Sequence, residues 1–268
     1  MSDIANHDVP AQRWSYDAIA DVYDTEMGRS MPFDDVDWYR ALCLREGGRV
    51  LELGCGTGRI LIELLRSGVD AVGADRSLPM LARLRRDAEK YTLSPRVAQM
   101  DIAAPALTDS FRVVLLPYSL LTYLREPGVV GQALSSLAAL LEPGGCMVLD
   151  AFVPQPVESF ADFRLDYRRP HEGGFLERRK RISANIDGTN RIERLYTLFD
   201  GDNIAAAEFV TDETIRPYCA EELVRLGSSA NLAVESCHWD YDARAQVEGA
   251  RFATIVLRKD QAVCAAAD

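Results

Sequence analysis

The chain has 268 residues, 48% of them hydrophobic, and a formal net charge of −11. This length allows one large α/β domain with an elaboration, or two small domains, around a sizeable core. The acidic balance argues against a long phosphate-backbone footprint, because nucleic-acid binding depends on clustered Lys and Arg. We therefore expect a small-molecule partner and no nucleic acid.

Six cysteines are dispersed without any C-x-x-C pair. That spacing disfavours a zinc site and a disulfide framework, so we expect no metal and a reducing, cytoplasmic compartment. The N-terminus shows no basic start followed by an apolar core, and no apolar run approaches about 18 residues, which argues against export and membrane spanning. Residues 1–13 predict a disordered tail. The sequence leaves open whether the protein is a monomer or a homodimer.

Residues 15–28 predict an amphipathic helix. Ser15 is placed to cap it, Gly28 to end it, and Tyr16 and Tyr23 fall on one face. The simplest interpretation is that both rings pack this helix on the domain. A second helix, predicted for residues 34–45, leads to a Gly-Gly turn and the first strand.

The segment V-L-E-L-G-C-G-T-G-R-I predicts a strand, a tight turn and the start of a helix. Gly54, Gly56 and Gly58 suit a backbone that needs positive φ and lets a ligand approach closely. A dinucleotide fold uses G-x-G-x-x-G, but Arg59 stands where its third glycine or alanine would be. Glu52, two residues before the turn, is suited to a cationic amine rather than to a phosphate.

This acid-x-G-x-G-x-G pattern resembles the first motif of the class I S-adenosylmethionine-dependent methyltransferases. The resemblance implies S-adenosyl-L-methionine as cofactor and an α/β, Rossmann-like fold with a seven-stranded, mostly parallel sheet and helices on both faces. In similar enzymes, including sugar N-methyltransferases of antibiotic pathways and glycine N-methyltransferase, an N-terminal helix bearing tyrosines covers the cofactor. The resemblance therefore suggests that the hydroxyl of Tyr16 or Tyr23 reaches the cofactor or the acceptor.

Two further acids end predicted strands, Asp75 after V-D-A-V-G-A and Asp101 after R-V-A-Q-M. A carboxylate at Asp75 suits both hydroxyls of a ribose, in either class of nucleoside cofactor. The resemblance implies that Asp101 receives the adenine amino group and that the next backbone N–H, of Ile102, addresses the ring. Because acids at the ends of neighbouring parallel strands converge above the sheet, Glu52, Asp75 and Asp101 predict one nucleoside site.

Ser77 is placed to cap the next helix, in which Met80 is one of several apolar residues. Met80 either packs in the core or corresponds to the adenine wall of the family that the chain resembles. The residues that we expect to bind the cofactor are Tyr16, Tyr23, Glu52, Gly54, Cys55, Gly56, Gly58, Asp75, Arg76, Met80, Met100, Asp101, Ile102 and Leu116.

Residues 111–124 predict a buried fourth strand that ends at Pro117, where the substrate would face the methyl group. The following polar and aromatic segment lacks the N/D-P-P-Y signature of methyltransferases acting on nucleobases or protein amides, which argues against those substrates. We expect the substrate-binding residues to be Tyr118, Ser119, Tyr123 and Phe152. A helix at residues 129–141 and the segment L-E-P-G-G-C-M-V-L-D, similar to the family's turn into strand five, come next.

After strand five we expect an inserted antiparallel sheet. Residues 154–170 are punctuated by prolines, and three alternating runs follow, separated by D-G-T-N and D-G-D-N, which are hairpin signals. Basic residues at positions 178–181 alternate between its two faces, so that one of them faces the pocket or all protect a solvated edge. We expect this sheet, within residues 154–216, to cap the mouth of the active site.

A helix at residues 220–230 and two final strands, the last antiparallel, are predicted to close the main sheet. The predicted organisation is therefore a cofactor-binding domain, with its N-terminal lid helix, formed by residues 14–153 and 217–260, and a cap at 154–216.

Methyl transfer from a sulfonium needs mainly alignment and a dry site. An amine acceptor needs only its neutral lone pair, whereas an alcohol or phenol profits from a base. The candidate catalytic residues are His171 in the cap, His238 near the end of strand six, and Tyr23, although a histidine is more often a surface or packing residue.

We expect a methyltransferase acting on an N or O atom of a small molecule, a secondary metabolite. One alternative is a nicotinamide-dependent oxidoreductase, which Arg59, Glu52 and the L-E-P-G-G order disfavour. The other is a non-catalytic relative that binds the cofactor only as a regulatory module, against which the intact glycines and the three strand-end acids speak.

Overall fold

The computed structural model describes residues 14–27, 35–242 and 249–261. The expected tail at 1–13 and Gly28, the expected end of the first helix, lie outside the described residues. No helix in the described ranges is long and apolar enough to cross a membrane.

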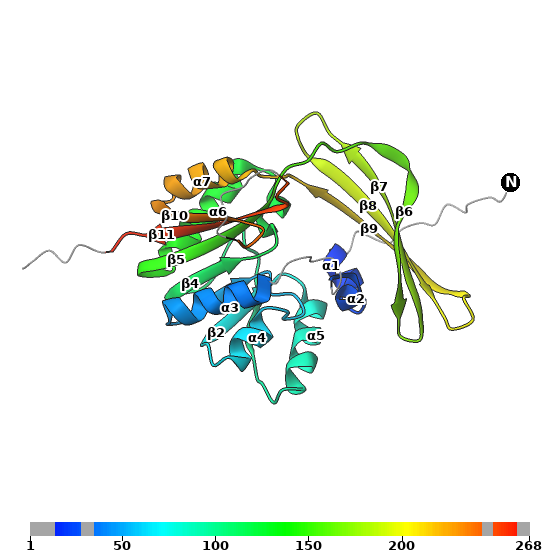
Figure 1. Ribbon diagram of the computed structural model, residues 1–268, viewed down its shortest axis with the longest axis horizontal. Coiled ribbons are helices and arrows are strands. Elements are labelled where there is room, and N and C mark those ends of the chain that lie inside the picture. The colour runs from blue at the N-terminus through cyan, green and yellow to red at the C-terminus, as the bar shows by residue number, and fades with distance from the viewer. Residues whose placement is uncertain (1–13, 28–34, 243–248, 262–268) are drawn as a thin grey trace, which may run out of the picture.

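The larger sheet has seven strands in the order β10-β11-β5-β4-β1-β2-β3 (Figure 1). Neighbours among β1 to β5 run parallel, and β11 runs antiparallel to both β5 and β10. The predicted Rossmann-like sheet with an antiparallel last strand is confirmed. The strands are β1 (Val50–Leu53), β2 (Ala71–Asp75), β3 (Arg96–Gln99), β4 (Phe111–Leu116), β5 (Leu141–Phe152), β10 (Leu232–Trp239) and β11 (Phe252–Lys259).

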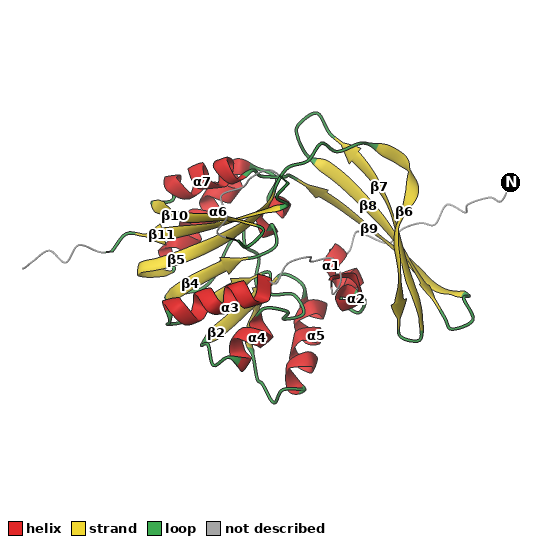
Figure 2. Ribbon diagram, viewed as in Figure 1, coloured by secondary structure: helices red, strands yellow, loops and turns green. Residues whose placement is uncertain are grey.

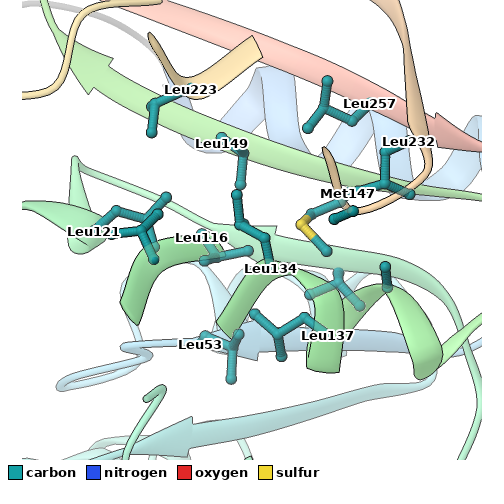
Figure 3. Packing of buried hydrophobic residues seen from close by; sticks show 14 of the residues in the cluster. Leu53, Leu116, Leu121, Leu134, Leu137, Met147, Leu149, Leu223, Leu232 and Leu257 are labelled. Carbon is teal, nitrogen blue, oxygen red and sulfur yellow. The ribbon is translucent and has the colours of Figure 1, made fainter. Parts of the chain in front are cut away.

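Helices cover both faces of this sheet (Figure 2). They are α3 (Asp35–Glu46), α4 (Leu61–Arg66) and α5 (Leu78–Glu89) on one face, and α6 (Pro127–Ala139) and α7 (Ala220–Ser229) on the other. Successive strand residues point to opposite faces, so Leu116 and Leu149 pack against Leu134 of α6 (Figure 3), while Leu115 and Val148 belong to the core beneath α3 and α4. Both faces of the parallel strands are therefore buried, which explains their nearly continuous apolar sequence.

The predicted single helix at residues 15–28 is wrong. The segment forms two short helices, α1 (Ser15–Ile19) and α2 (Tyr23–Met27), joined by a tight turn in which the Val22 N–H donates to the Ile19 carbonyl at 2.9 Å. The turn keeps Ile19, Ala20 and Val22 buried together. Ser15 makes no capping bond, because Trp14 occupies the N-cap position.

A second, antiparallel sheet is inserted after β5, as predicted. Its strands, in spatial order, are β6 (Phe160–His171), β7 (Gly174–Ala184), β8 (Asn190–Phe199) and β9 (Ala205–Ile215). Strand β6 was not expected, because prolines punctuate this stretch. It is an edge strand that pairs only with β7, where Pro170 is tolerated because an edge position needs no backbone donor on its outer side.

The sheet of β6 to β9, named the cap sheet for its position, packs over α1 and α2, named the lid helices, which lie between it and the Rossmann-like domain (Figure 1). Ile19, Ala20 and Val22 pack with Met80 of α5 on one side and with Leu176 and Tyr196 of the cap on the other. The lid is thereby held from both sides.

Candidate active site

The glycine turn after β1 has the backbone that the sequence predicts. Gly54 and Gly58 have φ of 65° and 92°, in the region that favours glycine. A Cβ at Gly54 would lie 2.8 Å from Cδ1 of Leu120, and one at Gly58 would lie 2.8 Å from Cγ of Leu84. The lack of a side chain at Gly54 therefore allows the segment after β4 to pack closely on the turn. At Gly58 it allows α5 to pack closely, and no ligand is involved there.

A cavity of about 160 Å³ lies over this turn, beneath the lid. The predicted site residues that line it are Tyr16, Tyr23, Gly54, Gly56, Asp75, Arg76, Met100, Asp101, Ile102, Tyr118 and Tyr123. The carboxyl ends of strands β1, β2 and β3 therefore meet at one crevice, as expected for this edge of a parallel sheet.

Five further lining residues were missed as site residues: Trp14, Ala103, Pro117, Leu120 and Leu124. Leu120 and Leu124 belong to an apolar segment that is typical of core, and Trp14 precedes the first helix, so no local pattern marks them. Pro117 carried a signal, since it breaks strand β4 at the crevice.

Glu52, in β1 two residues before the glycine turn, is only 2% exposed and does not line the cavity. Its Oε2 has no hydrogen-bond partner among the described residues. Burial raises the pKa of Glu52 to about 8, although the charge of Arg59 acts in the opposite direction. Arg59 itself is engaged by both oxygens of Asp35, at 2.6 Å each, so Glu52 keeps one acceptor oxygen available for a cationic group.

Asp75 accepts backbone N–H bonds from Gly56 and Ser77, each at 2.8 Å. Burial raises its pKa, and these backbone donors oppose the shift. The carboxylate is therefore fixed at the end of β2, beside the glycine turn. Ser77 caps α5 as predicted, with its Oγ accepting the Met80 N–H at 3.3 Å.

Aromatic side chains form the lid side of the cavity. The hydroxyls of Tyr16 and Tyr123 share a hydrogen bond of 2.5 Å, and the Tyr16 and Tyr23 ring centroids are 6.0 Å apart. The Trp14 ring packs on Tyr16 and Tyr123, and the Arg76 guanidinium lies over it at 4.7 Å. Burial raises the pKa of Tyr16, Tyr23 and Tyr123 above its usual range, so these hydroxyls remain neutral.

Three residues expected at the cofactor pack elsewhere. Met80 is 1% exposed and joins the lid cluster, while Leu116 lies in the core shared with α6. The Cys55 side chain is buried against Gly73, where a Cβ would lie 2.8 Å from its sulfur. None of these three side chains lines the cavity.

Of the expected substrate residues, Tyr118 and Tyr123 line the cavity, whereas Ser119 and Phe152 do not. Ser119 is buried and its Oγ accepts the Phe152 N–H at 2.5 Å. The Phe152 ring packs on Tyr118 and Phe252, with centroids 5.4 and 4.6 Å away. Both residues therefore support the segment that carries Tyr118.

The two histidines lie away from the cavity. His171, at the end of β6, hydrogen-bonds the Thr25 hydroxyl through Nδ1 at 2.8 Å and lines a separate, open hollow of about 550 Å³. His238 packs on the Trp38 ring and contacts Ser236, and burial lowers its pKa. Their positions give no support for a catalytic base.

The basic residues of β7 all have acidic partners. Arg178 pairs with Glu26 of α2 and with Asp166 of β6, and Lys180 also pairs with Asp166. Arg179 and Arg181 pair with Glu177 and Glu193. None of the four lines the cavity. Arg178 instead links β7 of the cap sheet to α2 through its ion pair with Glu26.

Comparison with known proteins identifies the family. Residues 50–145 match the model of a methyltransferase domain. The chain is 33% identical over 172 residues to demethylmenaquinone methyltransferase of Thermus thermophilus, covering 60% of this chain and 76% of that protein. The chain belongs to the S-adenosylmethionine-dependent methyltransferases. It spans 54% and 57% of two bacterial putative methyltransferases.

Two further comparisons cover more of the chain. A dTDP-3-amino-3,4,6-trideoxy-α-D-glucopyranose N,N-dimethyltransferase of Streptomyces venezuelae is 29% identical over 188 residues, covering 68% of this methyltransferase and 76% of the relative. The structure of the CcbJ methyltransferase of Streptomyces caelestis superposes with a TM-score of 0.74 at 23% identity, covering 90% and 96% of the two chains. The second likeness shows a shared fold.

The cofactor of this methyltransferase family is S-adenosylmethionine, and the residues present fit it. The unpartnered, buried oxygen of Glu52 suits an ammonium group. Asp75 and Asp101 are acceptors at two further strand ends, and Gly54 and Gly56 leave the floor of the cavity without side chains. An unpaired carboxyl oxygen is costly in a protein core, and a polar group of a ligand would satisfy it.

Proposed function

We propose that this methyltransferase methylates a nitrogen atom of a small, amine-bearing molecule. The observation that carries the proposal is the lining of the cavity, which holds tyrosines with raised pKa and no histidine. An amine needs only its neutral lone pair, whereas an alcohol or phenol profits from a base, and the cavity's acids are proposed below to hold the cofactor. Transfer to oxygen is the less favoured form of the same reaction.

The cofactor residues take distinct roles in this proposal. Glu52 receives the ammonium group, Asp75 the ribose hydroxyls, and Asp101 with the Ile102 N–H the adenine edge. Gly54 and Gly56 let the backbone approach the ligand. When bound, the cofactor supplies the electrophilic methyl group and its own leaving group, so the chain has to align and desolvate the reacting atoms.

The acceptor is proposed to lie beside Tyr118 and Tyr123, at the end of β4. The neutral Tyr16 and Tyr123 hydroxyls orient the nucleophile by hydrogen bonding, and Tyr23 closes the cavity on the lid side. The rings exclude water, which competes for the same positions. In this arrangement Tyr16, Tyr23 and Tyr123 position the acceptor, and none of them removes a proton.

We further propose that the acceptor is an amino sugar or a similar polar amine of secondary metabolism, as in antibiotic tailoring. The support is the Streptomyces venezuelae relative, whose name describes N,N-dimethylation of a dTDP-linked amino sugar. Residues 154–216 act as the cap in this proposal, because their sheet holds the lid over the cavity.

The test is a matched acceptor panel. The protein is incubated with S-adenosylmethionine and pairs of dTDP-sugars that differ only in carrying an amino or a hydroxyl group at one carbon, and products are followed by mass spectrometry. A mass increase of one or two methyl groups on the amino member alone is expected. Transfer only to the hydroxyl members would refute nitrogen methylation, and transfer to neither would refute the sugar acceptor.

A further inference from the structure

Asp150 of β5 is a buried carboxylate that the reaction described above does not use. It is 1% exposed and accepts four hydrogen bonds. Oδ2 accepts from the Tyr39 hydroxyl at 2.6 Å, the Tyr241 hydroxyl at 2.7 Å and the Tyr118 N–H at 2.8 Å. Oδ1 accepts from the Thr254 hydroxyl at 2.8 Å. These four hydrogen bonds link one side chain to α3, to β11, to the segment after β10 and to the segment after β4.

The segment after β4 has an unfavourable backbone. Tyr118 and Ser119 both have φ of 54°, in the left-handed region that non-glycine residues rarely adopt. Two consecutive residues of this kind persist only when the surroundings fix them. Two bonds do so: Asp150 accepts the Tyr118 N–H, and Ser119 Oγ accepts the Phe152 N–H at 2.5 Å.

The same turn shapes the cofactor cavity. Tyr118 lines the cavity, and Leu120, two residues later, packs so closely on Gly54 that a Cβ there would collide with it. Relaxation of the turn would therefore move Tyr118 at the acceptor side and Leu120 at the glycine turn together.

We propose that Asp150 is a positioning residue, which holds the Tyr118–Ser119 turn in its left-handed conformation and thereby sets the shape of the site where cofactor and acceptor meet. Asp150 does not touch the cavity; it acts through the Tyr118 amide. The proposal rests on the methyltransferase activity but not on the identity of the acceptor. Its test uses S-adenosylhomocysteine as the probe, so failure of the amine-acceptor proposal would leave it intact.

The test compares Asp150→Asn with Thr254→Val. Asparagine keeps the size of the side chain but replaces the carboxylate by a neutral amide with one acceptor oxygen, which holds the Tyr118 N–H and the two tyrosine hydroxyls more weakly than the charged group does. Thr254→Val removes one hydroxyl from the same carboxylate and leaves the Tyr118 N–H its acceptor. Calorimetric titration with S-adenosylhomocysteine and amide hydrogen exchange of the peptide containing Tyr118 are the two measurements.

In Asp150→Asn we expect the affinity for S-adenosylhomocysteine to fall about tenfold, in line with the loss of a buried bond to a charged group, and the Tyr118 amide to exchange faster. Thr254→Val should keep the affinity within about twofold, because the turn keeps its tether. An Asp150→Asn protein with unchanged affinity or unchanged exchange at Tyr118 would overturn the proposal, as would an equal loss of affinity in both variants.

If Asp150→Asn fails to fold, Ser119→Ala is the variant that tests the proposal. It removes the other hydrogen bond that holds the same turn, the one from the Phe152 N–H to Ser119 Oγ. Weaker binding of S-adenosylhomocysteine with faster exchange at Tyr118 would then support the proposal. Unchanged binding in Ser119→Ala would overturn the claim that this turn sets the shape of the site.

Discussion

The proposed role of Glu52 predicts that cofactor binding releases a proton. Burial raises the pKa of Glu52 to about 8, so most molecules carry the neutral acid at pH 7. An ammonium group beside the unpartnered Oε2 favours the carboxylate and lowers this pKa again. Binding at pH 7 should therefore release up to about one proton per ligand from this residue.

The sign of the pH dependence follows. A ligand that binds the carboxylate form binds more tightly as pH rises toward 8, by up to about tenfold per pH unit, and the gain ends above pH 8. The stability of the ligand-free protein depends on pH in the opposite direction. A carboxyl whose folded pKa lies above its unfolded value of 4.5 stabilises the fold at low pH, and this contribution is lost as pH rises to about 8.

The assay is calorimetric titration with S-adenosylhomocysteine at pH 7, in two buffers with different ionisation enthalpies, on the wild type and on Glu52→Gln. The variant has nearly the same shape and cannot ionise. We expect the wild type to release more protons than the variant, by up to about one proton per ligand. Equal proton release in the two proteins would refute the assignment of Glu52 to the ammonium group.

Three other substitutions test the glycine turn, the packing of the lid helices and the ion pair between α2 and β7. Gly54→Ala places a methyl group 2.8 Å from Leu120 Cδ1 at a φ of 65°, so we expect a lower Tm and at least about tenfold weaker S-adenosylhomocysteine binding, and an unchanged titration would contradict the close approach. Met80→Ala removes a buried side chain from the lid cluster and should cost about 2–5 kcal/mol in urea unfolding, whereas a cost below about 1 kcal/mol would count against core packing there. Glu26→Gln removes the acidic partner by which α2 meets Arg178, so amide exchange in α2 should rise while exchange in α6 stays constant; equal changes in both helices would argue against a local clamp.

Local patterns predicted part of the lining of the cavity. The strand-turn-helix at Gly54 and the acids Asp75 and Asp101 each follow from a few neighbouring residues, and the parallel-sheet rule brings them to one cavity. Glu52, the third predicted acid, is buried and does not line that cavity. The break between α1 and α2 was not predicted, because the periodicity of the segment shows an apolar face but not that Ile19 and the residues after it are buried from two sides.

The support of the acceptor side depends on contacts between distant residues. Asp150 meets Tyr39, Tyr118, Tyr241 and Thr254, which are between 32 and 111 residues away in the chain. No spacing rule links them, and an acid within an apolar strand gives no indication of its partners. The histidines show the converse error: His171 and His238 were singled out by residue type, and packing places both outside the cavity.

The most direct test of the account is a calorimetric titration of the wild type and Asp75→Ala with S-adenosylhomocysteine, with a nicotinamide dinucleotide as control ligand. We predict tight binding of S-adenosylhomocysteine to the wild type, weaker binding by about tenfold or more in Asp75→Ala, and no competition from the dinucleotide. Preference for the dinucleotide, or an Asp75→Ala protein that binds S-adenosylhomocysteine as tightly as the wild type, would contradict the placement of the cofactor over the glycine turn.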